Sequence, residues 1–181
     1  MNEGLIPSRY ARALYKYAAE QKATESVYGE MKKLEQSYAA EEEFAKTVEN
    51  PFLPLSDRLS LLLSASGAEP EGCLSRFFKL VFSHHRETFI RQMAFAYGRQ
   101  YREENGIAQV EITTASVLPA AVEDRIKAAV QASLKGKKPE YSERTDSSLI
   151  GGFTVRVDSL LLDASMSSEL RKLRLKLLSK K

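Results

Sequence analysis

The side chains best suited to nucleophilic or metal-binding chemistry are the single cysteine, Cys73, and the only two histidines, His84 and His85. A thiol and an imidazole act together only within hydrogen-bond reach. If Cys73 and His84 share a helix, a rise of about 1.5 Å per residue places them about 16 Å apart. Adjacent histidines diverge by about 100° on a helix, so they are poor chelators together. We therefore predict a polar helix end and one small thiol here, with no catalytic dyad and no metal site.

Two further segments resemble sites of chemistry only superficially. The glycine-rich residues 148–153 lack the Lys-Ser/Thr pair of a phosphate-binding loop and lead into a strand, so we interpret them as a tight bend or bulge. The acidic residues 41–43 suit the first turn of a helix, where carboxylates interact favourably with the helix dipole. No Ser-His-Asp set, catalytic carboxylate pair or HExxH motif can be argued. The sequence thus predicts no catalytic residues, no cofactor and no enzyme activity.

Composition is that of an ordinary globular protein, with 181 residues, 43% apolar and 28% charged. The longest apolar stretch, near residues 59–63, is far shorter than the roughly 18–20 residues that cross a bilayer. The net charge of +3 comes from six basic residues after Glu169, without which the remainder is net negative. This basic C-terminal segment leaves three interpretations open: ordinary solvated charge at a helix end, contact with a membrane surface, or contact with RNA.

Up to about Asn105, apolar residues recur at the spacing that lets a helix bury one face. Asn50-Pro51 interrupts the pattern, because proline disfavours helix in the residue before it. The predicted helices cover residues 5–21, 27–38, 41–48, 54–63, 74–81 and 89–101. The predicted fold class is mostly α, with an N-terminal six-helix bundle over residues 1–105.

The spacing changes after Asn105-Gly106, which predicts a small α+β C-terminal domain over residues 106–181. Alternation predicts strands around residues 110–112 and 153–157, and the second strand is expected to pair with 160–162. Helical spacing returns in two segments, 119–134 and 166–177, and residues 136–139 are expected to form a turn.

Two helices carry more apolar surface than a small bundle needs. The first has two adjacent stripes, and the fifth has a stripe that Leu80 and Phe82 broaden beyond the face of about 100° that buries a helix. A partner's amphipathic helix could lie in a groove between them, or both helices could simply be central. The pattern leaves both open. The stripes consist of Ile6, Tyr10, Ala13 and Tyr17, then Ala11, Leu14 and Ala18, and on the fifth helix Leu74, Phe77, Phe78 and Val81.

Three motifs are similar to those of a known family. They are Tyr-Ala-Arg-Ala-Leu at residues 10–14, Tyr-Arg-Glu at 101–103 with the strand after Gly106, and Asp-Ser-Ser-Leu-Ile-Gly-Gly-Phe-Thr-Val-Arg-Val at 146–157. Over nearly its whole length the chain resembles the delta subunit of F-type ATP synthase, whose mitochondrial relative is the oligomycin sensitivity-conferring protein. It departs from the family at residues 163–165, Asp-Ala-Ser for Asp-Gly-Ser, and at residues 84–87, His-His-Arg-Glu for Asn-Gly-Arg-Leu.

The resemblance implies a non-catalytic stator subunit of the proton-translocating ATP synthase, at the cytoplasmic face of the bacterial cell membrane. Such a subunit links the alpha/beta catalytic head to the peripheral-stalk b subunits so that rotor torque drives ATP synthesis. It implies no nucleic acid and no direct membrane insertion. The alternative is a small RNA- or membrane-surface-binding module that uses the basic C-terminal helix.

The resemblance also implies two binding sites. The N-terminal domain would hold an N-terminal helix of an alpha subunit between its first and fifth helices, and the C-terminal domain would bind the b subunits. The expected alpha-facing residues are Tyr10, Ala13, Tyr17, Phe77 and Leu80. The expected stalk-facing residues are Leu170, Leu173 and Leu177.

Overall fold

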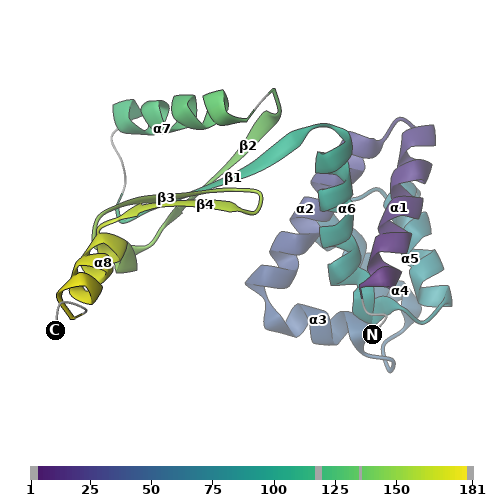
Figure 1. Ribbon diagram of the computed structural model, residues 1–181. Helices are drawn as coiled ribbons and strands as arrows, with labels where there is room; N and C mark the ends of the chain where they lie inside the picture. The colour runs from purple at the N-terminus through teal and green to yellow at the C-terminus, as the bar shows by residue number, and fades with distance from the viewer. Residues whose placement is uncertain (1–3, 117–119, 135, 179–181) are drawn as a thin grey trace. The chain divides into compact units, whose positions relative to one another are not determined.

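A computed structural model describes residues 4–116, 120–134 and 136–178 of the chain. The chain forms two compact units, Met1–Tyr101 and Arg102–Lys181 (Figure 1). The first unit is helical, and a small four-stranded sheet lies in the second, so the chain as a whole is mostly helical.

The helical unit is built from helices that follow the apolar spacing of the sequence closely. A short 3-10 turn, η1 at Glu87–Phe89, precedes the last of them. Glu42 and Glu43 occupy the first turn of the third helix, as the acidic run predicted. The helices are α1 (Leu5–Glu20), α2 (Thr24–Ala40), α3 (Glu42–Glu49), α4 (Leu55–Ser66), α5 (Cys73–Ser83) and α6 (Ile90–Glu104).

Three of these helices are closed by a left-handed residue and a backbone hydrogen bond that follows it. The residues are Lys22 after α1, Gly67 after α4 and His85 after α5, with φ of 54°, 68° and 53°. In each case the next N–H donates to the carbonyl five residues earlier, which satisfies an orphan carbonyl of the last turn. Glycine adopts this conformation without strain, whereas Lys22 and His85 do not. The three bonds are Ala23 to Ala18 at 2.9 Å, Ala68 to Leu63 at 3.1 Å and Arg86 to Val81 at 3.1 Å.

The core of the helical unit contains large side chains that are fully buried. Tyr97 of α6 is the largest, and its hydroxyl donates to the carbonyl of Thr24 at 3.1 Å, which satisfies its polar end. Burial raises the pKa of the Tyr97 phenol. Other fully buried members are Phe78, Met31, Leu34, Leu62, Leu74, Ile90 and Met93.

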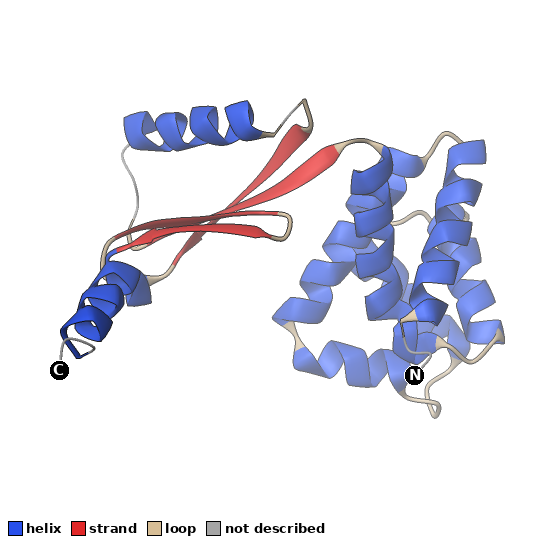
Figure 2. Ribbon diagram, in the orientation of Figure 1, coloured by secondary structure: helices blue, strands red, loops and turns tan. Residues whose placement is uncertain are grey.

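The C-terminal unit is a sheet with one helix covering one face (Figure 2). The strand order is β2-β1-β3-β4, with β1 and β2 parallel and the other neighbours antiparallel. Alternate residues of β1, Ala108, Val110 and Ile112, form its core with Ile126 and Val130 of the covering helix and with Leu134 just after it. The elements are β1 (Ile107–Thr114), α7 (Ala120–Ser133), β2 (Lys138–Thr145), η2 (Ser147–Leu149), β3 (Gly152–Val157), β4 (Leu160–Ser165) and α8 (Met166–Leu178).

The prediction of a turn at residues 136–139 was wrong at its end, and the strand that follows was missed. β2 starts at Lys138, and Lys138 and Pro139 already pair with Ile107 and Ala108 of β1. The segment Lys-Pro-Glu-Tyr-Ser-Glu-Arg-Thr has no apolar alternation because β2 is an edge strand with much of its surface in solvent. Proline is tolerated at such an edge, where an N–H has no partner strand. The predicted pairing of 153–157 with 160–162 is confirmed.

The glycine-rich residues 148–153 form a bend that enters β3, as predicted. Gly152 has φ of 77°, and a Cβ there would lie 2.2 Å from the Ala164 carbonyl oxygen. Only glycine fits this position without moving backbone. The neighbouring Gly151 carbonyl accepts a hydrogen bond of 2.9 Å from the Met166 N–H, so the same bend positions the start of α8.

Candidate functional site

The two apolar stripes of α1 differ in how deeply they are buried. Ala11, Leu14 and Ala18 are buried in the core. In the other stripe Tyr10 and Tyr17 are half-buried and Ala13 is exposed. The sequence pattern did not show which stripe faces the core, because both have helical spacing. The stripe that remains partly outside is the one that holds the three predicted alpha-facing residues of α1.

The wide apolar face of α5 is likewise divided between core and surface. Phe77, Phe78 and Phe82 are buried, and the Arg58 guanidinium lies 4.9 Å above the Phe82 ring, where it also meets the Glu87 carboxylate. Leu80 is 48% exposed. Thus Phe82 broadens the stripe because it is core, whereas Leu80 extends it onto the surface.

Aromatic and polar contacts join α1 to α5 along this surface. The Tyr10 and Phe77 rings meet edge to face, with centroids 6.3 Å apart. A second contact lies two turns further along α1. There the guanidinium of Arg76, the residue before Phe77, donates to the Tyr17 hydroxyl oxygen at 2.8 Å. The two helices are therefore held side by side. We call the surface made by Tyr10, Ala13, Tyr17, Phe77 and Leu80 the α1–α5 face.

The α1–α5 face has the features of a helix-binding surface. Its floor consists of rings that are already fixed by their contacts, which lowers the entropy lost on binding. Ala13 is exposed and small, so a partner backbone can approach α1 closely there. Leu80 offers an aliphatic side chain that is half in water on the facing helix. Such a floor and edge suit the apolar side of an amphipathic helix.

Cys73 and the two histidines lie at opposite ends of α5. Cys73 begins α5 and is partly buried, His84 caps its other end, and His85 follows in the left-handed conformation. Among the residues that the structure describes, no group of three or more His, Cys, Asp or Glu side chains could hold a metal ion. No helix in the described ranges is long and apolar enough to span a bilayer.

In the C-terminal unit, α8 presents its apolar side chains to solvent. None of its described residues is buried, and the predicted stalk-facing Leu170, Leu173 and Leu177 are all more than half exposed. At about 100° per residue these three lie within about 60° of one another, in line with Met166. We call Met166, Leu170, Leu173 and Leu177 the α8 stripe.

A network of hydrogen bonds positions the first turn of α8. The Ser165 hydroxyl accepts from the Ser168 N–H at 3.3 Å, which caps the helix. The Asp163 carboxylate in turn accepts from the hydroxyls of Ser168 and Ser165 and from the Ser165 N–H. These hydrogen bonds, that of Ser168 first, lower the pKa of Asp163 to about 2. The exposed helix is thus anchored at one end, although no side chain of its described residues is buried.

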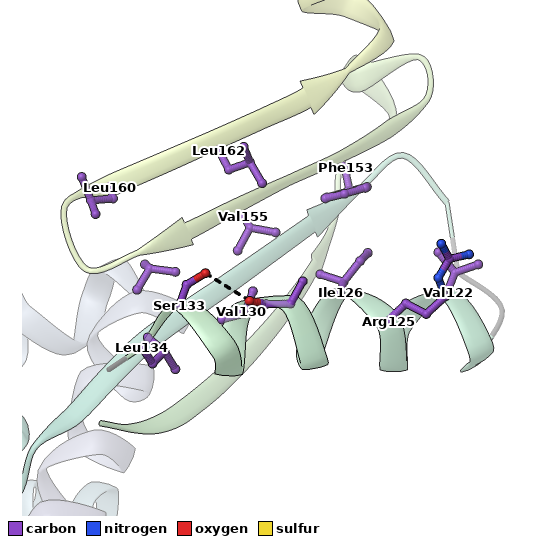
Figure 3. A pocket seen from close by; sticks show the side chains of 12 residues that line it. Val122, Arg125, Ile126, Val130, Ser133, Leu134, Phe153, Val155, Leu160 and Leu162 are labelled. Carbon is purple, nitrogen blue, oxygen red and sulfur yellow. Dashed lines mark hydrogen bonds between the residues drawn. The ribbon is translucent and has the colours of Figure 1, made fainter. Parts of the chain in front are cut away.

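An apolar hollow of about 640 Å³ opens between α7 and the β3–β4 hairpin (Figure 3). Leu160 and Leu162 of β4 line it on one side, and Val122, Ile126 and Val130 of α7 line it on the other. The hollow exists because α7 packs over β1 and leaves the β4 side of the same sheet face uncovered. Sequence reasoning missed this feature, because the three consecutive leucines at residues 160–162 do not show which of them face a helix.

The sequence profile of one family, "ATP synthase delta (OSCP) subunit", matches residues 6–177 of the chain. The chain is 36% identical over 181 residues to "ATP synthase subunit delta" of Parabacteroides distasonis, with 98% of each chain covered. It is 32% identical to the protein of the same name from Caulobacter sp., covering 92% of this chain and 90% of the relative.

A solved structure shares the fold. A chain of the Toxoplasma gondii mitochondrial ATP synthase hexamer superposes with a TM-score of 0.71, covering 95% of this chain and 97% of that one. The two sequences are only 21% identical, so this comparison bears on the fold alone.

Proposed function

The chain belongs to the ATP synthase delta (OSCP) subunit family, and from this premise we propose which of its surfaces hold the stator together. It is a non-catalytic stator subunit of the F-type ATP synthase and associates peripherally with the membrane-bound complex. Its part in ATP synthesis is mechanical, because a stator must resist rotor torque. The alternative of an RNA- or membrane-surface-binding module has no support in the comparisons.

The six helices of residues 1–105 act as one bundle that binds the catalytic head. In this proposal the α1–α5 face holds the N-terminal helix of an alpha subunit, with Tyr10 and Phe77 as its floor. The observation that carries the proposal is Leu80, a large aliphatic side chain that is 48% exposed beside rings fixed by contacts between α1 and α5. When a partner covers an exposed leucine of this kind, the loss of apolar surface from water stabilises the complex.

Apolar packing is the interaction that such a clamp requires. A contact that holds against torque must dissociate slowly, and a nanomolar Kd corresponds to about 12 kcal/mol of binding free energy. Exposed ion pairs contribute only about 0.2–1 kcal/mol each, so they do not supply this alone. Burial of the apolar side of a helix against Ala13, Leu80 and the aromatic floor supplies the larger part.

The test is a titration of the whole protein with a synthetic peptide that covers the N-terminal helix of the alpha subunit of the same ATP synthase. Leu80→Asp is expected to weaken binding at least about tenfold, since a carboxylate would be desolvated against apolar groups. Leu55→Asp is the matched control, because Leu55 is 49% exposed and begins α4. Equal affinity of a folded Leu80→Asp variant and the control would refute the assignment.

The C-terminal domain of residues 106–181 binds the b subunits of the peripheral stalk along the α8 stripe. The supporting observation is that these aliphatic side chains lie in solvent on a helix whose start is fixed by Asp163 and Ser165. The basic residues of α8 add attraction to an acidic partner. We propose that the chain acts at the cytoplasmic face of a bacterial membrane, a location that its bacterial relatives support.

A variant pair on one helix tests the stalk assignment. Leu173 and Leu175 are 53% and 60% exposed, but about 170° separates Leu175 from the centre of the α8 stripe. Leu173→Asp is expected to reduce binding of a peptide from the C-terminal end of the cognate b subunit, and Leu175→Asp to leave it nearly unchanged. If the two variants weaken binding equally, the stripe is not the contact surface.

A further inference from the structure

The charged side chains of α1 are nearly all positive. Three cations, Arg9, Arg12 and Lys16, follow one another at spacings of three and four residues, and Glu20 at the end of the helix is its only carboxylate. None of the three cations forms an ion pair with any residue that the structure describes. We call Arg9, Arg12 and Lys16 the α1 basic strip.

The second helix of the α1–α5 face has the same sign. α5 carries Arg76 and Lys79 and has no carboxylate at all. Arg76 already points to α1, since it donates to the Tyr17 hydroxyl oxygen at 2.8 Å. A helix that lies on this face therefore meets positive charge from both of its neighbours.

The α1 basic strip and the α1–α5 face are continuous at Ala13. A shallow hollow of about 430 Å³ on α1 is lined by Ala13 together with the three cations, Leu5 and Ser8. Arg9 and Lys16 lie one turn before and one turn after Ala13, on its outer side. The exposed methyl of Ala13 leaves this space open between the two long cationic side chains, next to the apolar floor.

We propose that the α1 basic strip selects the partner of the α1–α5 face: an amphipathic helix that carries carboxylates along the flank above α1. This inference rests on the function proposed for that face and adds the chemistry of its partner. Arg9 and Lys16 pair with carboxylates on the flank nearest Ala13, and Arg12 extends the positive field. The apolar floor holds the helix, while the strip sets its orientation and rejects helices with a basic flank.

A protein helix fits this surface better than a membrane does. Binding in a membrane interface requires a broad apolar face next to the cations. Among the described residues of α1 and α5, only Leu5 and Leu80 are large apolar side chains with high exposure. The tyrosine rings of α1 are half-buried against their neighbours, so they are not free to enter lipid.

Exposed charge pairs act mainly on the association rate, and salt screens them. Neutralising Arg9 and Lys16 is expected to raise the Kd for an acidic-flanked helix about 3- to 10-fold, mostly through slower association. The wild-type Kd is expected to rise with salt concentration, and the variant should lose much of this dependence. Replacing carboxylates of the peptide by amides should reproduce both effects.

The experiment compares Arg9→Gln/Lys16→Gln with Lys33→Gln/Lys46→Gln, which makes the same change in net charge at positions of α2 and α3. Association and dissociation rates are measured in the full chain with the alpha-subunit peptide, at low and at physiological salt. A slower association rate and a weaker salt dependence in the first variant alone support the proposal. Equal rates in the two variants, with Leu80→Asp still defective, overturn it and leave the α1–α5 assignment standing.

Two further results separate the remaining explanations. If the peptide does not bind the folded wild-type protein at all, the function proposed for the face fails and this inference fails with it. Vesicles of phosphatidylcholine with phosphatidylglycerol test the membrane alternative. If Arg9→Gln/Lys16→Gln abolishes vesicle binding but leaves the peptide rates unchanged, the strip is a lipid contact and the proposal is wrong.

Discussion

The two units of the chain differ in how they treat their apolar side chains. In the helical unit, Phe78, Tyr97 and other large residues are fully buried, and exposed large hydrophobics are scattered singly. In the C-terminal unit, a core of seven buried residues lies under one helix, whereas leucines cover β4 and α8 in solvent. The helical unit thus buries most of its large apolar side chains, and the C-terminal unit leaves many of its own in solvent.

The contrast has a physical basis in size and layering. A small unit buries a smaller fraction of its surface, and a sheet covered on one face by one short helix has little core. The apolar hollow beside α7 and the exposed α8 stripe are consequences of this thin construction. We expect the helical unit to be stable alone and the C-terminal unit to gain much of its stability from the stalk.

The largest effect is expected from the core of the helical unit. Phe78→Ala should lower the free energy of unfolding of this unit by about 3–5 kcal/mol, because Phe78 is fully buried on α5 and its loss leaves a cavity. Leu80→Ala, two residues further along the helix, should change it by no more than about 0.5 kcal/mol. Urea unfolding followed by signals from each unit measures both. Similar losses for the two variants would mean that the contrast between core and surface on α5 is false.

The next effect should be confined to the C-terminal unit. Gly152→Ala should destabilise the C-terminal unit by about 1–3 kcal/mol. The reason is that Gly152 has φ of 77° and the new Cβ would lie 2.2 Å from a carbonyl oxygen of β4. Gly106→Ala is the control, since Gly106 has φ of 60° but a Cβ added there would have no atom within 4 Å. Amide hydrogen exchange should increase in β3 and β4 for the first variant more than for the second. Increased exchange throughout the helical unit would argue against two separately stabilised units.

One substitution at the end of α5 should make the helical unit more stable. His85→Gly should stabilise the helical unit by about 0.5–1 kcal/mol, because His85 closes α5 in the left-handed conformation with φ of 53°. His84→Gly is the control, since His84 has φ of −98° and gains nothing from glycine. The midpoint of urea unfolding measures the effect. A lower midpoint for His85→Gly would show that the imidazole makes a contribution larger than the strain.

The smallest effect concerns acid and the anchor of α8. The pKa of Asp163 lies near 2 in the folded protein, below its ordinary value of 3.8, so the contribution of this carboxylate is present above that value. It should be lost as the pH falls through the window between 3.8 and about 2. NMR signals of the Ser165 and Ser168 amides should report loosening of the first turn in this window. Asp163→Asn should remove that pH dependence, and its persistence would assign the effect to another group.

Much of the fold could be predicted because buried residues recur periodically in the sequence. The prediction failed where such a periodic face is absent. The helices from α1 to α6 bury one regular face each, so their apolar spacing located them to within a few residues. β2 has no such face in its sequence, because it is an edge strand whose pairing with β1 rests mainly on backbone groups. Backbone pairing leaves no trace in the order of side chains, and the strand was therefore missed.

The candidate sites show a second limit of sequence reasoning. Both stripes of α1 have helical spacing, and only packing reveals that Leu14 is core while Tyr10 lies at the surface beside Phe77. The hollow beside α7 depends on how far a helix covers a sheet, which no local pattern encodes. The stalk-facing and alpha-facing residues remain predictions that the variants above test.

The central claim is that the α1–α5 face of the helical unit binds a helix of the catalytic head. The most direct measurement is heteronuclear NMR of the labelled full chain during titration with the alpha-subunit N-terminal peptide. We expect saturable one-to-one binding, with the largest shifts along α1 and α5 and near Leu80, and little change in β1–β4. Saturable binding with its largest shifts on α7, β4 or α8, or no shift in the folded protein, would contradict it.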